Sequence, residues 1–212
     1  MSDASPSLRA RRRAETQRAI QAHAMRLFTG KGYDATTVNE IADAAGVSPM
    51  TLYRHFPTKE DLVLVDQIGQ LIAERIAAGP VDGSLIDRIG RALVEAARTI
   101  TASDDELLLA RLRLMIATPA LRARHLDNQL AIQQTIVDAV LAGDTDPEAD
   151  PEAEADTDTE AGFRAWAAAG ACLAALYVAL MRWANEDGRP DLADLLTTAL
   201  AAAFDASPSR WR

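Results

Sequence analysis

Residues 48–59 bring together side chains with the chemistry to read a nucleic acid. Arg54 carries a guanidinium fork that matches the hydrogen-bonding edge of guanine, and Thr51 offers a hydroxyl and a methyl group to base edges. Met50 has an apolar side chain that can pack on a thymine methyl group. Three neighbours carry groups that suit contacts with phosphate, namely Tyr53, His55 and Lys59.

Two short helices joined by a glycine turn would position these groups. Residues 34–37 offer caps for the first helix, and Gly46 ends it. Its inward stripe consists of Val38, Ile41, Ala42 and Ala45. Ser48 caps the second helix, Pro49 takes the first helical position, where its missing N–H does no harm, and the helix stops at Phe56-Pro57. This spacing predicts a helix-turn-helix, whose second helix lies in a major groove.

The second helix is expected to have one packed side and one polar side. At about 100° per residue, Leu52 and Phe56 point within about 40° of each other and define the inward side. Arg54 points directly away from them. The residues beside it and on its flanks are Met50, Thr51, Tyr53 and His55. The alternative is a pair of scaffold helices in which Arg54 is simply a solvated charge.

Two further features favour contacts with a nucleic acid. Thr37 and the N–H groups at the start of its helix offer a phosphate clamp. The basic residues from Arg9 to Arg13 lie in a predicted disordered tail, residues 1–10, and at the start of the next segment. They can add non-specific affinity or enter a minor groove.

The rest of the chain predicts further helices, so the fold class is all-α with about nine helices. Ala is abundant, only 5% of residues are aromatic, and apolar residues recur at three-to-four spacing. A long helix is expected from Thr58 to about Gly79, and a capping box at Ser103–Glu106 predicts a new helix after one that covers 85–101. The remaining predicted helices are 12–28, 121–141, 163–186 and 191–204.

Charge is distributed unevenly along the chain. The formal net charge is −9, but residues 1–60 hold nine Lys/Arg against six Asp/Glu. Residues 143–160 contain nine acidic residues and no basic residue, so their charge equals the net charge of the whole chain. They also offer no apolar face. We therefore expect a disordered acidic linker there. A calcium loop is the alternative, but Ala149 and Ala155 stand where glycine and the last ligand are required.

Several classes of protein are excluded or disfavoured by the sequence. A single cysteine, Cys172, allows no intramolecular disulfide, and the basic amino terminus lacks the apolar core of a secretion signal. Residues 165–181 are uncharged but rich in Ala, which favours a buried helix over a membrane span. No catalytic residues, metal ligands or cofactor motif emerge from the three histidines and their neighbours. We expect a cytoplasmic protein that is not an enzyme.

The order of residues 36–62, TTVNEIADAAGVSPMTLYRHFPTKEDL, closely resembles the TetR family of bacterial transcriptional regulators. The match covers about fifty residues, including Leu27-Phe28 and Gly32-Tyr33. The resemblance implies a homodimeric repressor with a helix-turn-helix at 11–57 and a helical domain at 58–212 that binds a small molecule and releases its DNA operator. DNA contacts of the family fall on Thr37, Ser48, Pro49, Thr51, Tyr53, His55 and Lys59.

Two residues depart from the family pattern. Met50 stands where many members have a small residue, which leaves base preference there open. Arg54 is the most outward residue by angle, yet the family assigns the contacts to its neighbours. The competing function is a helical ligand-binding or adaptor protein that has lost DNA binding, and the retained polar face of residues 48–56 argues against it.

TetR-like proteins usually dimerise through their last two long helices, here Phe163–Met181 and Leu192–Phe204. Both segments are rich in apolar and small residues, which allow helices to approach closely. An intrachain core is the alternative use of these faces. A pocket for a largely apolar effector is expected among helices between Leu85 and Tyr177. Its candidate residues are Arg111, Met115, His125, Gln129, Gln133 and Trp166.

Overall fold

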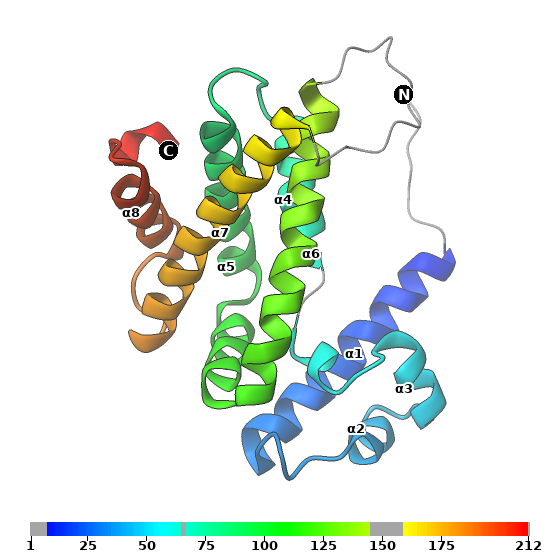
Figure 1. Ribbon diagram of the computed structural model, residues 1–212. Coiled ribbons are helices and arrows are strands. Elements are labelled where there is room, and N and C mark those ends of the chain that lie inside the picture. Colours follow the sequence, from blue (N-terminus) through cyan, green and yellow to red (C-terminus); the bar gives the residue numbers. More distant parts are fainter. Residues whose placement is uncertain (1–7, 65–66, 145–158, 212) are drawn as a thin grey trace. The chain divides into compact units, whose positions relative to one another are not determined.

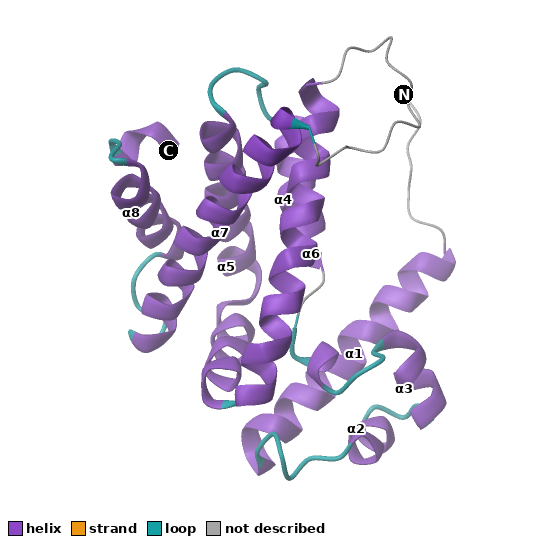
Figure 2. Ribbon diagram, in the orientation of Figure 1, coloured by secondary structure: helices purple, strands orange, loops and turns teal. Residues whose placement is uncertain are grey.

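Helices account for all the regular secondary structure in the residues described by the structure, a computed structural model that covers 8–64, 67–144 and 159–211 (Figures 1 and 2). Within these ranges there are eight α-helices and two short 3-10 helices. The all-α prediction is therefore confirmed. The chain divides into two compact units, one formed by Met1–Val65 with Arg113–Arg124 and the other by Asp66–Leu112 with His125–Arg212.

The first unit contains α1 (Leu8–Lys31), α2 (Val38–Ala44), α3 (Pro49–His55) and η1 (Glu60–Leu62). Ile20, Ala24 and Phe28 form the buried stripe of α1, as their spacing predicts. The helix ends where Gly32 adopts a positive φ of 94°, a conformation that favours glycine. The prediction of a disordered tail over 1–10 is wrong for residues 8–10, because α1 already begins at Leu8. Residues 1–7 lie outside the described ranges.

The predicted long helix from Thr58 to Gly79 is also wrong. Thr58 and Asp61 do form the reciprocal cap, since each backbone N–H donates to the side-chain oxygen of the other. However, η1 ends at Leu62, and α4 (Gln67–Ala78) begins separately. Leu62, Val63 and Leu64 are all buried.

The second unit is built from α4, most of α5 (Leu85–Ala117) and α6 (Pro119–Asp144), α7 (Glu160–Asn185), α8 (Leu192–Phe204) and η2 (Pro208–Trp211). The predicted break at Ser103–Glu106 is absent, because α5 runs through it without interruption. Ser and Asp cost only a few tenths of a kcal/mol each inside a helix, which a packed helix tolerates. Residues 145–158 of the predicted acidic linker lie outside the described ranges.

Packing of α7 against α8 forms much of the second unit's core. Leu192, Leu196 and Leu200 of α8 are buried, and so are Cys172 and Trp183 of α7. Helix α7 is the one described helix that is long and apolar enough to cross a membrane, and a third of its most apolar window is buried inside the unit. A single helix of this kind is weak support for a membrane span, because core helices of folded domains have the same composition.

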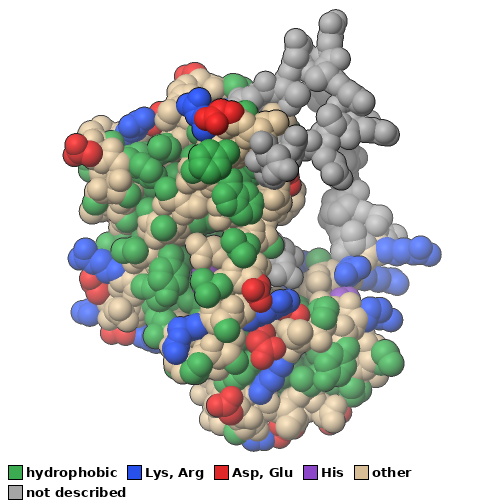
Figure 3. Space-filling view, viewed as in Figure 1, with side chains coloured by type: hydrophobic (Ala, Val, Ile, Leu, Met, Phe, Trp, Pro, Cys, Tyr) green, Lys and Arg blue, Asp and Glu red, His purple; other side chains and the backbone are tan. Residues whose placement is uncertain are grey.

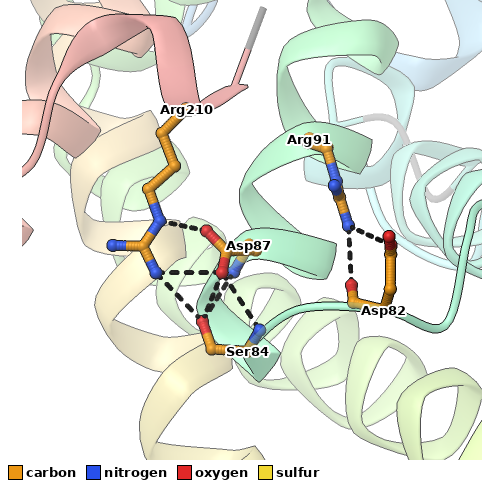
Figure 4. A network of polar contacts seen from close by, with 5 residues as sticks. All are labelled: Asp82, Ser84, Asp87, Arg91 and Arg210. Atoms are coloured by element: carbon orange, nitrogen blue, oxygen red, sulfur yellow. Dashed lines mark hydrogen bonds and ion pairs between the residues drawn. The ribbon is translucent and has the colours of Figure 1, made fainter.

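The last residues of the chain fold back onto the start of α5, which the sequence did not predict. The Arg210 guanidinium donates to both oxygens of Asp87, and its Nη2 lies 3.3 Å from the Ser84 hydroxyl oxygen (Figure 4). Trp211 is only 1% exposed. It lies against Gly90, where an added Cβ would come within 2.4 Å of the indole nitrogen. We call residues 208–211 the carboxy-terminal clasp.

Candidate nucleic-acid interface

Helix α3 is shaped by local capping. The Ser48 side chain accepts a hydrogen bond from the Thr51 backbone N–H at 3.1 Å, and Pro49 occupies the first helical turn. Phe56 leaves the helical conformation and caps the other end, donating its N–H to the Leu52 carbonyl at 2.8 Å. The predicted limits of this helix are confirmed.

The two sides of α3 differ in exposure as the angular argument predicts. Leu52 is fully buried and Phe56 nearly so. Met50 is 78% exposed, and Tyr53 and Arg54 are exposed as well. Thr51 and His55 are half-buried, and Ser48 and Pro49 are exposed. The predicted outer residues therefore share one accessible side of a helix that is fixed to the unit by its inner side.

The start of α2 holds a carboxylate where a phosphate clamp was predicted. Glu40 accepts hydrogen bonds from the backbone N–H of Thr37 at 2.8 Å and from its hydroxyl at 2.9 Å. It also pairs with Lys31. The Lys31 ammonium and the two Thr37 donors hold the pKa of Glu40 at about 2, so Glu40 is ionised at neutral pH. The Thr37 hydroxyl thus already serves an internal capping box.

Lys59 lies against the turn between α1 and α2. Its Nζ donates to the Tyr33 carbonyl oxygen at 2.6 Å and lies 4.2 Å from the centroid of the Tyr33 ring. The Phe28 ring is 5.7 Å away. Tyr33 in turn donates its hydroxyl to Glu60 at 2.9 Å, and burial together with this carboxylate raises the Tyr33 pKa well above its usual range. The ammonium of Lys59 is therefore engaged inside the unit, in contrast to the outward residues of α3.

His55 is the half-buried member of the α3 group. Its Nδ1 is buried and has no hydrogen-bond partner among the described residues. Burial lowers the His55 pKa, and the positive charges of Arg13 and Arg54 lower it further. Since its ordinary pKa is near 6.5, His55 is neutral at pH 7. Arg13 reaches this site from α1 rather than from a flexible tail, and Lys and Arg side chains gather where α1 begins (Figure 3).

The six predicted ligand residues are divided between the two units. Gln133 is buried, and its amide donates to the Trp166 carbonyl at 2.8 Å. The His125 ring stacks on Tyr177 with centroids 5.8 Å apart, and burial lowers the His125 pKa. Gln129 is half-buried and lies on α6, as do His125 and Gln133. Arg111 is half-buried and belongs to the second unit, whereas the buried Met115 belongs to the first.

Two cavities formed by described residues of the second unit have other linings. The larger has a volume of about 340 Å³ and lies where α5 meets the turn between α7 and α8. Its lining includes Arg98, Thr101, Trp183, Asp191 and Leu192. The smaller measures about 110 Å³ and lies between the end of α4 and the first turns of α5. None of the six predicted residues lines either cavity.

The predicted dimer segments use only part of their apolar surface inside the chain. Leu173 of α7 is buried, as are the three leucines of α8 named above. Another stripe of α7 stays exposed at three-to-four spacing, and hydrophobic side chains gather over this helix in Figure 3. Its residues are Phe163, Ala167, Ala171, Ala174, Tyr177 and Val178. The single apolar face predicted from the sequence is thus divided between an inner and an outer stripe.

Comparison with known proteins supports the interpretation of both units. Residues 20–65 match the family "Bacterial regulatory proteins, tetR family", and residues 83–206 match the "MftR C-terminal domain". The transcriptional regulator TcmR of Streptomyces glaucescens is 31% identical over 128 residues, which is 57% of each chain. The regulator MftR of Mycobacterium tuberculosis is 30% identical over 114 residues, 53% of this chain and 58% of the relative. The aligned part thus spans little more than half of these relatives.

Solved structures show the same fold. FadR of Thermus thermophilus, a TetR-family transcriptional repressor solved with lauroyl-CoA, aligns with a TM-score of 0.53 at 23% identity, over 88% of this chain and 92% of that one. A TetR-family regulator of Streptomyces coelicolor aligns with a TM-score of 0.55 at 18% identity, over 95% and 97%. The relatives are named as regulators, in agreement with the prediction that the protein is not an enzyme. The chain therefore belongs to the tetR family of bacterial regulatory proteins, with a carboxy-terminal domain of the MftR type.

Proposed function

We propose that the protein is a homodimeric repressor that binds operator DNA through α3 and leaves it when a small molecule binds the second unit. The exposed side of α3 carries this proposal. It presents Met50, Tyr53 and Arg54 to solvent while Leu52 fixes the helix from behind. A helix that is packed against its unit on one side and polar on the other suits insertion into a major groove.

We expect some of these residues to contact bases and others to contact phosphate. Thr51 and Arg54 have the groups to read base edges, and Tyr53 can donate to phosphate. His55 is neutral at pH 7, so it contributes a hydrogen-bonding group rather than a charge. Thr37 and Lys59 have internal partners in the free protein, so their direct contacts with DNA require those partners to be shared or exchanged.

Selection from a randomised DNA duplex pool tests operator binding. We expect a palindromic consensus, because a two-fold dimer reads two equivalent half-sites. Tyr53→Ala should then weaken binding of the dimer to all sites by about 2 kcal/mol, roughly thirtyfold, because each of the two subunits loses one phosphate hydrogen bond of about 1 kcal/mol. Thr51→Ala should relax preference at one base position, and Thr99→Ala on the exposed side of α5, outside both predicted dimer segments, is the matched control. A folded dimer that selects no sequence would overturn the proposal.

Arg54 requires its own measurement because angle and family resemblance disagree about it. If Arg54 reads guanine, Arg54→Gln changes the selected sequence. If it contacts phosphate, the same change leaves the selected sequence intact and lowers the slope of log affinity against log salt by about two, one for each subunit of the dimer. Arg182→Gln, on α7, removes an exposed arginine elsewhere and should do neither.

The exposed stripe of α7 is the surface we assign to a second copy of the chain. Its small residues allow close helix approach, and Phe163, Tyr177 and Val178 supply the apolar area. Val178→Glu should shift the protein to monomer in light scattering after size exclusion, because it places a charge in a dry interface. Ala77→Glu, at an exposed position of α4, should remain dimeric. A dimer that survives Val178→Glu would show that this stripe is not the interface.

We assign effector binding to the second unit. We also propose that the protein works in the cytoplasm, where its operator DNA lies. FadR of Thermus thermophilus and FadR of Bacillus subtilis were solved with lauroyl-CoA and stearoyl-CoA, respectively. These neighbours support a largely apolar effector, for which the predicted residues of the second unit remain the proposed contacts, namely Arg111, His125, Gln129, Gln133 and Trp166. Met115 belongs to the first unit and is not part of this proposal. Native mass spectrometry of the purified protein should detect such a ligand, and adding it should release the selected DNA. DNA binding that no bound ligand alters would contradict effector control.

A further inference from the structure

The small cavity between α4 and α5 has three arginines in its wall. Its volume is about 110 Å³, and one carboxylate, Glu95, also lines it. The full lining is Arg75, Ile76, Gly79, Pro80, Arg88, Arg91, Ala92 and Glu95. All of these residues belong to the second unit. Three positively charged side chains in the lining of so small a space are costly to bring together unless anionic groups balance them.

Arg88 forms the fixed part of this wall. It is only 6% exposed, and its Nη2 lies 3.4 Å from the Val140 carbonyl oxygen of α6. The same atom lies close to the backbone of Gly143, where an added Cβ would be 2.8 Å away. A guanidinium held in this way is oriented before any ligand arrives, which reduces the entropy lost on binding.

Arg75 and Arg91 form the exchangeable part of the wall. Arg75 contacts Glu95 at 3.2 Å, and Arg91 contacts Asp82 at 3.4 Å, the latter pair shown in Figure 4. The two carboxylate side chains are 58% and 80% exposed. Ion pairs of this kind contribute at most about 1 kcal/mol. Arg91 also donates to the Asp82 carbonyl oxygen at 2.9 Å, and Arg75 to the Thr99 hydroxyl at 3.3 Å. A more highly charged oxyanion therefore has to displace only the exposed carboxylates, while these two contacts hold the arginines in place.

We propose that this cavity binds the phosphate group of a small molecule. Guanidinium forks match phosphate oxygens in geometry, and each hydrogen bond between two charged groups is about twice as strong as a neutral one. The apolar side chains of Ile76 and Ala92 keep part of the wall dry, which strengthens these interactions. The volume admits a phosphate group but not a nucleotide, so any larger part of the molecule lies outside. The site goes beyond operator binding and does not depend on it.

Titration calorimetry with inorganic phosphate, and separately with glycerol phosphate, tests the site at constant ionic strength. We expect saturable binding of at least one probe, with sodium acetate giving none. Tighter binding of inorganic phosphate would identify the free ion as the ligand, and tighter binding of the ester would identify a phosphorylated metabolite. No saturable binding of either probe up to about 10 mM would overturn the proposal.

Variants locate the binding in the cavity. Arg91→Gln and Arg75→Gln should each weaken binding about tenfold or more, because each removes charged hydrogen bonds to the anion. Arg182→Gln is the matched control, since it also removes an exposed arginine that is paired with a glutamate. Glu95→Gln should tighten binding, because it removes the competing carboxylate, and damage to the fold cannot produce that gain. Equal losses in Arg182→Gln and Arg91→Gln, or weaker binding in Glu95→Gln, would exclude this cavity.

Discussion

Gly90 of α5 provides a sharp test of the carboxy-terminal clasp. An added Cβ there would lie 2.4 Å from the Trp211 indole nitrogen, which is closer than atoms can approach, so Gly90→Ala must displace the ring. Where no such clash exists, the same change stabilises a helix by about 1 kcal/mol. The sign of its effect therefore depends on whether Trp211 is present.

The magnitude follows from the burial of Trp211. Truncating a fully buried Trp to Ala costs about 3–5 kcal/mol. The indole N–H, however, has no hydrogen-bond partner among the described residues, and relieving that defect returns about 1–3 kcal/mol. We therefore expect Trp211→Ala to lower the free energy of unfolding by about 2 kcal/mol. Gly90→Ala should also lower the free energy of unfolding by about 2 kcal/mol, because it displaces the same ring. The change to a better helix former returns about 1 kcal/mol, so the net loss is about 1 kcal/mol.

A double-mutant cycle measures this coupling. Urea unfolding is followed by far-ultraviolet circular dichroism at one protein concentration, because association makes stability depend on concentration. Gly90→Ala should destabilise the wild-type chain but stabilise the Trp211→Ala chain by about 1 kcal/mol, a coupling of about 2 kcal/mol. If Gly90→Ala changes the free energy of unfolding in the same direction with and without Trp211, the indole ring does not occupy this position in solution.

Three other outcomes follow from single groups. Cys172 is buried, which raises the pKa of its thiol to about 12, so an aromatic disulfide reagent should label it only in denaturant, and rapid labelling of the native protein would contradict its burial. The Arg210 guanidinium holds the pKa of Asp87 well below its usual range, so its stabilisation is complete above about pH 4 and is lost as pH falls toward the folded-state pKa. The difference in the free energy of unfolding between wild type and Asp87→Asn should therefore shrink as pH falls below about 4, and a constant difference would refute this linkage. Lys59→Met should lower the free energy of unfolding by about 1–2 kcal/mol through lost contacts with Tyr33, whereas an effect on DNA affinity alone would show that the internal contacts are unimportant.

Local signals in the sequence predicted the helix-turn-helix well. Ser48, Pro49 and Gly46 act within a few residues of their own position, so capping and turn chemistry can be recognised without tertiary information. The difference in exposure between Leu52 and its neighbours likewise depends on the geometry of a single helix. The resemblance to a known family supplied the division into two functional parts, which periodicity alone does not reveal.

Features that depend on distant contacts escaped prediction. Ser103–Glu106 has the residues of a cap, but the packing of α5 on both sides of it decides that the helix continues. The clasp joins Arg210 to Asp87 across more than a hundred residues, and no local pattern marks that pair. The occupied hydroxyl of Thr37 and the engaged ammonium of Lys59 are likewise visible only when their partners are placed.

The distribution of tryptophan residues makes one of the two units optically distinct from the other. All three tryptophans, Trp166, Trp183 and Trp211, belong to the second unit, where Trp183 and Trp211 are buried. Tyr53, on the exposed side of α3, belongs to the first unit. Emission excited at the red edge of the tryptophan band therefore reports on the second unit alone. A fluorescent nucleotide analogue in the operator would follow DNA release in the same cuvette, so the order of the two events can be timed without attaching a dye to the protein.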